Sequence, residues 1–245
     1  MTTSRRQSRG RWGLAVAALL LAGCGPSEAE KQAAAAASAA AAASAKAQAE
    51  CAEGKKQLAA GWAKYAADLE TALKMTFEVR STTVAADQSL AELERLKKGD
   101  QSPQSEESKA MVDTTKAEVD AAKAALDAAK AAEKAASGPA GAARDASKTA
   151  LDKATTLHDM APKVFDALNA AKVSMIKSAR GHAEKAKEFG GDTPEAQALL
   201  NQIKEKEAAI AKEREEFSKP ADKLLEPATA AHKQAEANAT TCKEP

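Results

Sequence analysis

Aromatic side chains are scarce in this chain, and their scarcity limits the kind of core that it can build. The 245 residues include 2 Trp, 1 Tyr and 4 Phe, although 44% of all residues are hydrophobic. Alanine dominates the apolar share, and alanine buries little area but lets helices approach closely. A thick globular core is therefore not expected, and the composition favours thin helical bundles or coiled coils.

Strands are also not expected, because apolar and polar residues do not alternate with a period of two over any useful length. From residue 51 to 98, apolar residues instead recur at alternating spacings of four and three, which is the a/d seam of a heptad repeat. The seam comprises Leu58, Trp62, Tyr65, Leu69, Ala72, Thr76, Val79, Thr83, Ala86, Leu90 and Leu93. Trp62 and Tyr65 would suit a ligand pocket, but their seam spacing favours core packing. The sequence thus predicts an all-α fold.

Glycine and proline are few, and they mark the boundaries of four expected helices. Gly99 ends the first helix, and Ser102 is expected to cap the second, with Pro103 at its first helical position. The segment 137–141, Ser-Gly-Pro-Ala-Gly, separates the second helix from the third, and Gly190-Gly191 ends the third. The expected helices cover about 51–98, 103–137 and 140–189, and the last begins at Asp192-Thr193-Pro194-Glu195.

Short turns between these helices make neighbours antiparallel, so we expect an elongated antiparallel bundle or coiled coil. Pro162 is expected to kink the third helix, and Pro220 and Pro227 to weaken the second half of the fourth. The Gly138-Pro139 break favours four helices. An alternative keeps residues 104–189 as one long bent helix, with the first and last helices folded back from its ends.

Residues 1–23 have the three parts of an export signal. Four arginines without an acidic residue are followed by an apolar run, 14–21, that is too short to span a bilayer. The quartet Leu21-Ala22-Gly23-Cys24 then resembles the lipobox of bacterial lipoproteins, position for position. The resemblance implies cleavage between Gly23 and Cys24 and attachment of a diacylglycerol to the Cys24 sulfur. With two or three acyl chains, the mature protein would stay on its membrane.

The export route stays open, whereas the membrane on which the protein resides follows from the same resemblance. An ordinary signal peptide or an uncleaved anchor is the alternative to a lipobox, and Ser4-Arg5-Arg6 leaves both general and twin-arginine export open. In lipoproteins an Asp after the lipid-bearing Cys tends to retain the protein at the inner membrane. Gly25 stands at that position here. We therefore expect an outer-membrane protein of the cell envelope that faces the periplasm or the cell surface.

Removing the signal leaves two cysteines besides Cys24, and they lie near the ends of the expected folded part, residues 51–242. Cys51 and Cys242 are an even pair in an oxidising compartment, so we expect them to form a disulfide within one chain. A count of helix lengths puts Cys51 roughly 20 Å beyond the level of Cys242, and a few extended residues after Asn238 would bridge the gap. The preceding residues, 24–50, read as a lipidated, alanine-rich tether, and 243–245 as a tail.

The chain is similar in style to the Braun-type murein lipoproteins, in which a lipid-bearing cysteine is followed by alanine-rich heptads. Those proteins end in the lysine that joins peptidoglycan. Here Lys243 is followed by Glu244 and Pro245, so covalent linkage to the wall is not expected.

Titratable side chains form no catalytic or metal-binding pattern in the sequence. His158, His182 and His232 lack further ligands at metal spacing on a shared helix face, so we expect scattered, solvent-facing histidines. The runs 204–207 and 212–216 alternate in charge, which favours a solvated helix face with ion pairs four residues apart. Phosphate-binding loops and nucleophile–base sets are missing. We expect no metal, no cofactor and no enzymatic activity.

Net charge also excludes one class of partner. Without the four arginines of the signal, 32 basic residues stand against 35 acidic ones, which gives no electrostatic basis for binding nucleic acid. The expected protein is thus a non-enzymatic envelope lipoprotein that serves as a helical spacer or docks an unidentified protein. A periplasmic chaperone or an accessory subunit of an envelope complex is the alternative, and a wall-modifying enzyme is disfavoured.

Overall fold

The computed structural model describes residues 27–102 and 105–242, and all regular structure in these ranges is helical. The elements are α1 (Glu28–Ala72), a π-helical turn η1 (Leu73–Phe77), α2 (Glu78–Lys97), α3 (Glu106–Ala135), α4 (Ala140–His158), α5 (Met160–Leu168), α6 (Ala170–Gly190) and α7 (Pro194–Thr241). The predicted all-α class is therefore confirmed. None of these helices has the length and hydropathy needed to span a bilayer.

The chain divides into two units, residues 1–45 and 46–245. In the first unit, the described part is helical from Glu28, and every residue from 27 to 45 is exposed. Alanine has the highest helix propensity, which favours a helix here even though no side chain of this segment is buried.

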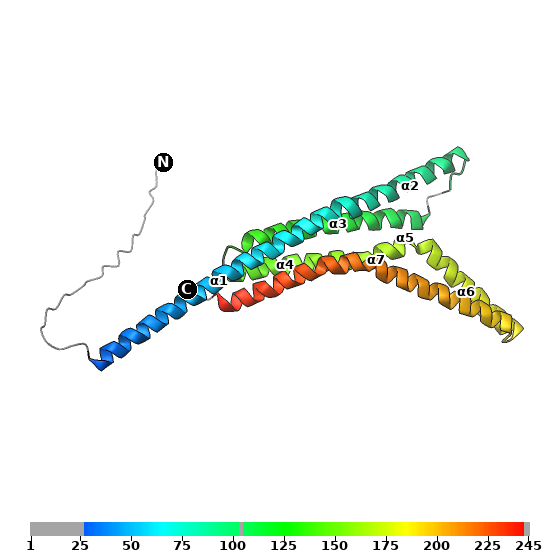
Figure 1. Ribbon diagram of the computed structural model, residues 1–245. Coiled ribbons are helices and arrows are strands. Elements are labelled where there is room, and N and C mark those ends of the chain that lie inside the picture. The colour runs from blue at the N-terminus through cyan, green and yellow to red at the C-terminus, as the bar shows by residue number, and fades with distance from the viewer. Residues whose placement is uncertain (1–26, 103–104, 243–245) are drawn as a thin grey trace, which may run out of the picture. The chain divides into compact units, whose positions relative to one another are not determined.

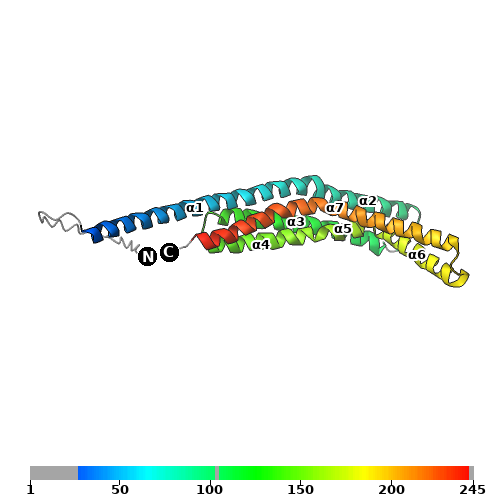
Figure 2. The ribbon, with the colours of Figure 1, turned by 60° about the horizontal axis from the view of Figure 1, so that its bottom comes forward.

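In the second unit, long helices run side by side (Figure 1). α3 packs against α4, and α4 packs against α7, so the chain passes back and forth in antiparallel steps. Figure 2 shows the same helices turned by 60°, still alongside one another. The break at Gly138 separates α3 from α4, so the alternative with one long helix over residues 104–189 is wrong.

Two hairpins extend from this shared region toward the right of Figure 1 and diverge there. One consists of α2 and the start of α3, and the other consists of α6 and the first part of α7. We call them the α2–α3 arm and the α6–α7 arm.

The core combines a few large side chains of α1 with small ones from its neighbours. Trp62 is completely buried, and its indole Nε1 donates a hydrogen bond to the hydroxyl of Ser147 in α4. Gly54 and Gly61 allow α7 to approach, because a Cβ on Gly54 would lie 2.3 Å from the Asn238 Oδ1. Apart from Thr115, Ser147 and Val164, the residues outside α1 with no exposed surface are alanines: Ala122, Ala125, Ala129, Ala132, Ala136, Ala150, Ala228 and Ala235. The alanine content thus acts through close helix approach, as the composition predicts.

The heptad seam of the first long helix is buried only in its first half. Leu58, Trp62, Tyr65 and Leu69 lie in the core, but from the π-helical turn onward the buried residues are Leu73 and Phe77 in the turn and Val84 after it. Val79, Leu90 and Leu93 are 55–60% exposed, so the prediction that they pack inward is wrong. A π turn holds one residue more than an α turn and shifts later side chains by about 100°. A straight helix drifts about 20° further per heptad, which carries the seam away from the core.

The expected third helix is broken twice, at Asp159 and at Asn169. In a continuous helix Pro162 would lack the hydrogen bond to the His158 carbonyl and its ring would clash with it, so the break at Asp159 lies in the turn that the predicted proline kink disrupts. At the second break the Asn169 side chain donates to the carbonyl of Phe165. Beyond this break Met175 of α6 is exposed.

One other local prediction needs correction, and one concerns prolines inside a helix. Ser105, not Ser102, caps α3 by accepting from the Ser108 N–H, whereas the Ser102 N–H donates to Asp100. Pro220 and Pro227 lie inside α7, and the helix continues through both to Thr241. Three boundary predictions are confirmed: Gly99 and Gly191 have positive φ after α2 and α6, and Thr193 caps α7.

Cys51 and Cys242 lie together and are joined through their sulfur atoms, with their Cα atoms 5.2 Å apart. α7 stays helical up to Thr241, so the expected extended stretch after Asn238 is absent from this part of the structure. The predicted offset of Cys51 was wrong because it assumed a tight turn between the first two helices, whereas α2 ends at Lys97 and α3 begins only at Glu106, which leaves room for α2 to extend past the start of α3.

Loss of this bond should destabilise the bundle. The two cysteines are separated by 191 residues, for which the chain-entropy model gives a stabilisation on the order of 5 kcal/mol. We expect the double variant Cys51→Ala/Cys242→Ala, or the reduced protein, to melt at a markedly lower temperature without a change in monomer mass. A nonreducing peptide map that finds both thiols free, or joined between chains, would contradict the closure.

Candidate functional site

The residues that the sequence singles out fall in different places. Gly23 and Cys24, the expected cleavage and lipidation residues, lie outside the described residues. Cys51 and Cys242 meet where α1 and the end of α7 lie together. Their role in the structure is to hold the end of α7 to α1. A binding or catalytic site in the described part has to be sought elsewhere.

Trp62 and Tyr65 pack in the core, as their spacing predicts, and do not line a ligand pocket. Their rings meet edge to face with centroids 5.8 Å apart, and both are buried. Burial raises the pKa of the Tyr65 hydroxyl to about 12. The cavity beside Tyr65 measures about 10 Å³, which is at the lower limit for a single water molecule. The aromatic pair therefore serves packing.

A buried ion pair joins three helices just beyond the π-helical turn. The Arg80 guanidinium contacts both carboxylate oxygens of Glu118 in α3 at 2.8 Å, and it lies 4.6 Å from the ring centroid of Phe217 in α7. Glu118 is only 2% exposed. Burial raises the pKa of its carboxyl group, and the charge and hydrogen bonds of Arg80 oppose that rise. The pair fixes where α2 leaves the shared region. The sequence shows no signal for it, because the partners are 38 residues apart.

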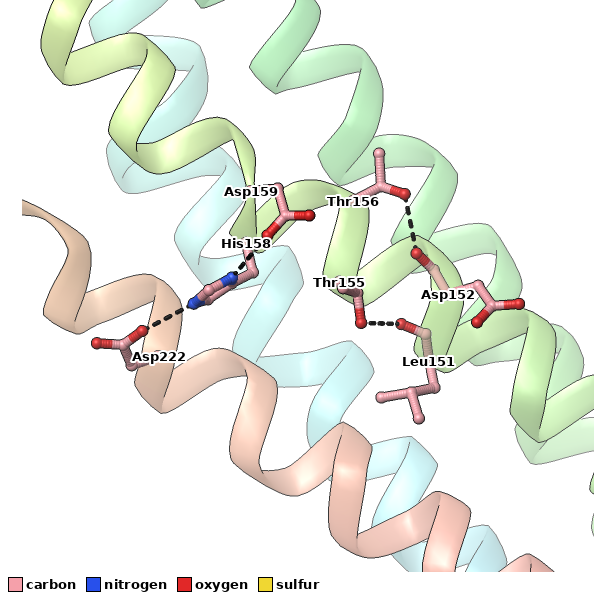
Figure 3. A network of polar contacts seen from close by, with 7 residues as sticks. All are labelled: Leu151, Asp152, Thr155, Thr156, His158, Asp159 and Asp222. Carbon is pink, nitrogen blue, oxygen red and sulfur yellow. Dashed lines mark hydrogen bonds and ion pairs between the residues drawn. The ribbon is translucent and has the colours of Figure 1, made fainter.

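His158 does not point freely to solvent, and the expectation that it does is wrong. Its Nε2 lies 2.8 Å from Asp222 in α7, and its Nδ1 lies 3.2 Å from Asp159 at the bend between α4 and α5 (Figure 3). Burial is the largest single effect and lowers the pKa of the imidazole. The hydrogen bonds and charges of Asp222 and Asp159 together outweigh it, so the pKa is raised above 6.5. His158 thus connects the bend to α7.

The other two histidines differ from each other. His182 is exposed on α6, as expected. His232 is largely covered in α7: its side chain is 15% exposed, and its Nε2 lies 3.6 Å from Glu236. His232 is therefore not solvent-facing, because α7 is most deeply packed in its last turns.

The two charged runs of α7 pair mainly across the arm and not within the helix. Lys172 in α6 contacts Glu213 at 2.7 Å, Arg180 contacts Glu207, and Arg214 contacts Asp166 of α5 at 2.6 Å. These partly exposed pairs replace the expected pairs four residues apart. Since each is worth at most about 1 kcal/mol, the α6–α7 arm is held together weakly compared with the core.

A shallow groove of about 630 Å³ lies between α5, α6 and α7 beside the second bend. Its floor is apolar, with Val173 and Ile210, and its rim carries charges of both signs, including Lys177 and Glu207. The bend at Asn169 opens this groove, because it turns α6 away from the line of α5. The volume of this groove and its combination of apolar and charged lining residues suit a side chain or a short segment of another molecule.

Large apolar side chains are exposed on both arms. Leu90, Leu93 and Leu96 lie on α2, each 55–60% exposed. On the α6–α7 arm, Met175 is 66% exposed, and Phe189, next to the Gly190 turn, is 87% exposed. Clusters of this kind, rather than titratable groups, are the principal unexplained features of the surface. The sequence analysis missed the cluster on α2 because it assigned Leu90 and Leu93 to a buried seam.

Protonation of His158 should stabilise the fold. A pKa raised above the unfolded value contributes stability that is complete below pH 6.5 and lost as the pH rises through the folded value. We expect His158→Gln to lower the free energy of unfolding by about 0.5 kcal/mol more at pH 5.5 than at pH 8.5, as for a partly exposed ion pair. Urea denaturation at both pH values measures this difference. In the Asp222→Asn background the pH dependence of the substitution should shrink, and an equal loss at both pH values would refute the assignment.

Within the described ranges, no group of three or more His, Cys, Asp or Glu side chains is placed to hold a metal ion. Comparisons with protein-family models, with curated proteins and with solved structures find no match for this chain.

Proposed function

We propose that this protein is a lipid-anchored helical module of the bacterial cell envelope that holds a docking surface away from its membrane. The observation that carries the docking role is the exposure of large apolar side chains on an arm that extends from a disulfide-closed core. The role requires no catalysis by the protein itself, and binding by the arm is sufficient for it.

The membrane anchor is supported by the sequence of residues 1–24. The positive start, the short apolar run and Leu21-Ala22-Gly23-Cys24 together have the order that lipid modification requires. Residues 27–45 are exposed along their whole length, as suits a tether between an anchor and a folded part. As a helix, the 26 residues from 25 to 50 would measure about 39 Å.

Cys24→Ala should abolish anchoring. Without the thiol there is no group for the thioether, so we expect uncleaved precursor or soluble protein in place of membrane-bound protein. Fractionation of cells and the mass of the N-terminal peptide measure the outcome. Cys51→Ala/Cys242→Ala is the matched control and should stay on the membrane. If Cys24→Ala were processed and retained on the membrane like the parent protein, the proposed anchor would be refuted.

The docking surface that we assign is one face of α6. Met175, His182 and Phe189 are exposed and follow one another at spacings of seven, so they lie along the same side of the helix. Burying a side chain such as Met or Phe gains about 1.5–3 kcal/mol, which makes Phe189 and Met175 suitable anchors for a partner. The groove with Val173 and Ile210 in its floor lies on the same arm.

A chaperone-like role is the second candidate, and the two diverging arms with exposed apolar residues favour it (Figure 1). A docking module has one defined partner, whereas a chaperone contacts many unfolded chains. The two roles therefore differ in the number of proteins that the arm contacts in the cell.

Crosslinking from Phe189 separates these roles. With Phe189 replaced by p-benzoylphenylalanine, we expect one discrete adduct in cells, identified by mass spectrometry, and its loss when Met175→Glu is added. The same photoreactive residue at Lys148, which is exposed on α4, is the control and should give no such adduct. Many adducts of different mass would favour the chaperone. No adduct, or the same adduct from both positions, would contradict docking at this face.

A further inference from the structure

The outward side of α2 carries an apolar heptad stripe that nothing else in the described ranges covers. We define the α2 stripe by its five core positions, Val79, Thr83, Ala86, Leu90 and Leu93, all of which are exposed. The side of α2 that packs against α3 is a different one, marked by the buried Val84. At 100° per residue, Leu90 lies about 120° and Leu93 about 180° from Val84 around the helix, so both are on the far side.

Both the spacing and the size of these side chains indicate a helical partner. Positions that alternate at spacings of four and three form a seam that another helix fills, knobs into holes. A single exposed leucine needs no explanation, but Leu90 and Leu93, with Leu96 beside them, form one continuous patch. Their exposure is a consequence of the π-helical turn, since that turn rotates the seam out of the bundle.

We propose that the α2 stripe binds the α2 stripe of a second copy of this chain, with the two helices antiparallel. The stripe is self-complementary only in that direction. Within it the small Thr83 and Ala86 precede the large Leu90 and Leu93, and Val79 at its N-terminal end faces Lys97 of the second copy. In an antiparallel pair every d position faces an a position, so Leu90 meets Ala86 of the second copy and Leu93 meets Thr83 of the second copy.

A parallel pair would fit poorly. Each residue would then face its own equivalent, with Ala86 against Ala86 beside Leu90 against Leu90. The leucines would hold the helices apart and leave a cavity at the alanines, which is unfavourable in proportion to its volume. The antiparallel pair alternates large and small at each layer and avoids both problems.

The residues that flank the α2 stripe are compatible with this pairing. Leu96 lies beside Thr82 of the second copy on one side, so another large residue meets a small one. On the other side Asp87 faces its own equivalent, but both carboxylates are exposed to solvent, where repulsion is weak. Arg80 already contacts Glu118 and is not needed for the pairing.

The size of the surface sets the strength of the dimer. From Val79 to Leu93 the stripe is about 21 Å long, so the buried area belongs to the class of small, transient interfaces. Association in dilute solution should therefore be weak. If the chain is anchored as proposed, confinement to one membrane raises the effective concentration and favours the dimer.

Cysteine crosslinking in the full-length chain tests the pairing directly. In the antiparallel register Ser89 faces Ser89 of the second copy across the two-fold axis, so Ser89→Cys should form a disulfide-linked dimer on mild oxidation. Leu96→Cys alone should not, because residue 96 lies eight positions from the two-fold axis at position 88, so its equivalents are about 16 residues or about 24 Å apart along the helix, beyond disulfide reach. Mixing Leu96→Cys with Thr82→Cys should give the mixed dimer. A nonreducing gel measures all three.

Charge placed on the stripe should abolish the crosslink without unfolding the chain. We expect Leu90→Glu/Leu93→Glu to lower dimer formation by Ser89→Cys at least tenfold, with an unchanged circular dichroism spectrum because both side chains are exposed. Met175→Glu on the other arm is the control and should have no effect. A Ser89→Cys chain that stays monomeric, or Leu96→Cys that crosslinks equally well by itself, would overturn the proposal.

The two proposals fail separately. The Phe189 adduct should persist in Leu90→Glu/Leu93→Glu, because it comes from the other arm. Loss of the dimer with retention of that adduct would reject self-association and leave docking at α6 intact. Loss of the adduct with retention of the Ser89→Cys dimer would reject docking at α6 and leave self-association intact.

Discussion

The π-helical turn from Leu73 to Phe77 determines which side of the first long helix faces the rest of the molecule. Before the turn, Leu58 to Leu69 fill the core, and after it the same heptad phase points outward. An inserted residue is costly to a continuous α-helix, and such turns persist where the surrounding structure requires them. Here Leu73 and Phe77, the first and last residues of the turn, are both buried, so the buried side of the helix continues through it.

The two arms differ in the interactions that hold them to the core. The buried pair of Arg80 and Glu118 lies just beyond the π-helical turn, where α2, α3 and α7 meet. A buried carboxylate without its partner would be strongly unfavourable, so the pair specifies one position for α2 on α3. The α6–α7 arm has no equivalent among the described residues and relies on exposed ion pairs and a few apolar contacts. The bend that His158 ties to α7 separates this weaker arm from the core.

Large parts of the fold were predictable because they depend on local chemistry. Glycines with positive φ end α2 and α6, Thr193 caps α7, and the first half of the seam is buried. Long-range features were not predictable in the same way. Neither the π turn nor the Asn169 bend has a sequence signature, and the π turn rotates the residues after it. Seam positions beyond that turn were therefore assigned to the wrong side, and the exposed apolar surface of α2 was missed.

In this structure α2 packs on α3 through Val84 and turns its heptad seam outward. Single cysteines at Val84, Leu90 and Leu93 test this arrangement through their rates of labelling by a maleimide, with the chain diluted to nanomolar concentration so that a weak dimer is dissociated. We expect fast labelling at positions 90 and 93 and slow labelling at 84. Slow labelling at 90 and 93 with fast labelling at 84 would mean that the seam remains buried and would contradict this arrangement.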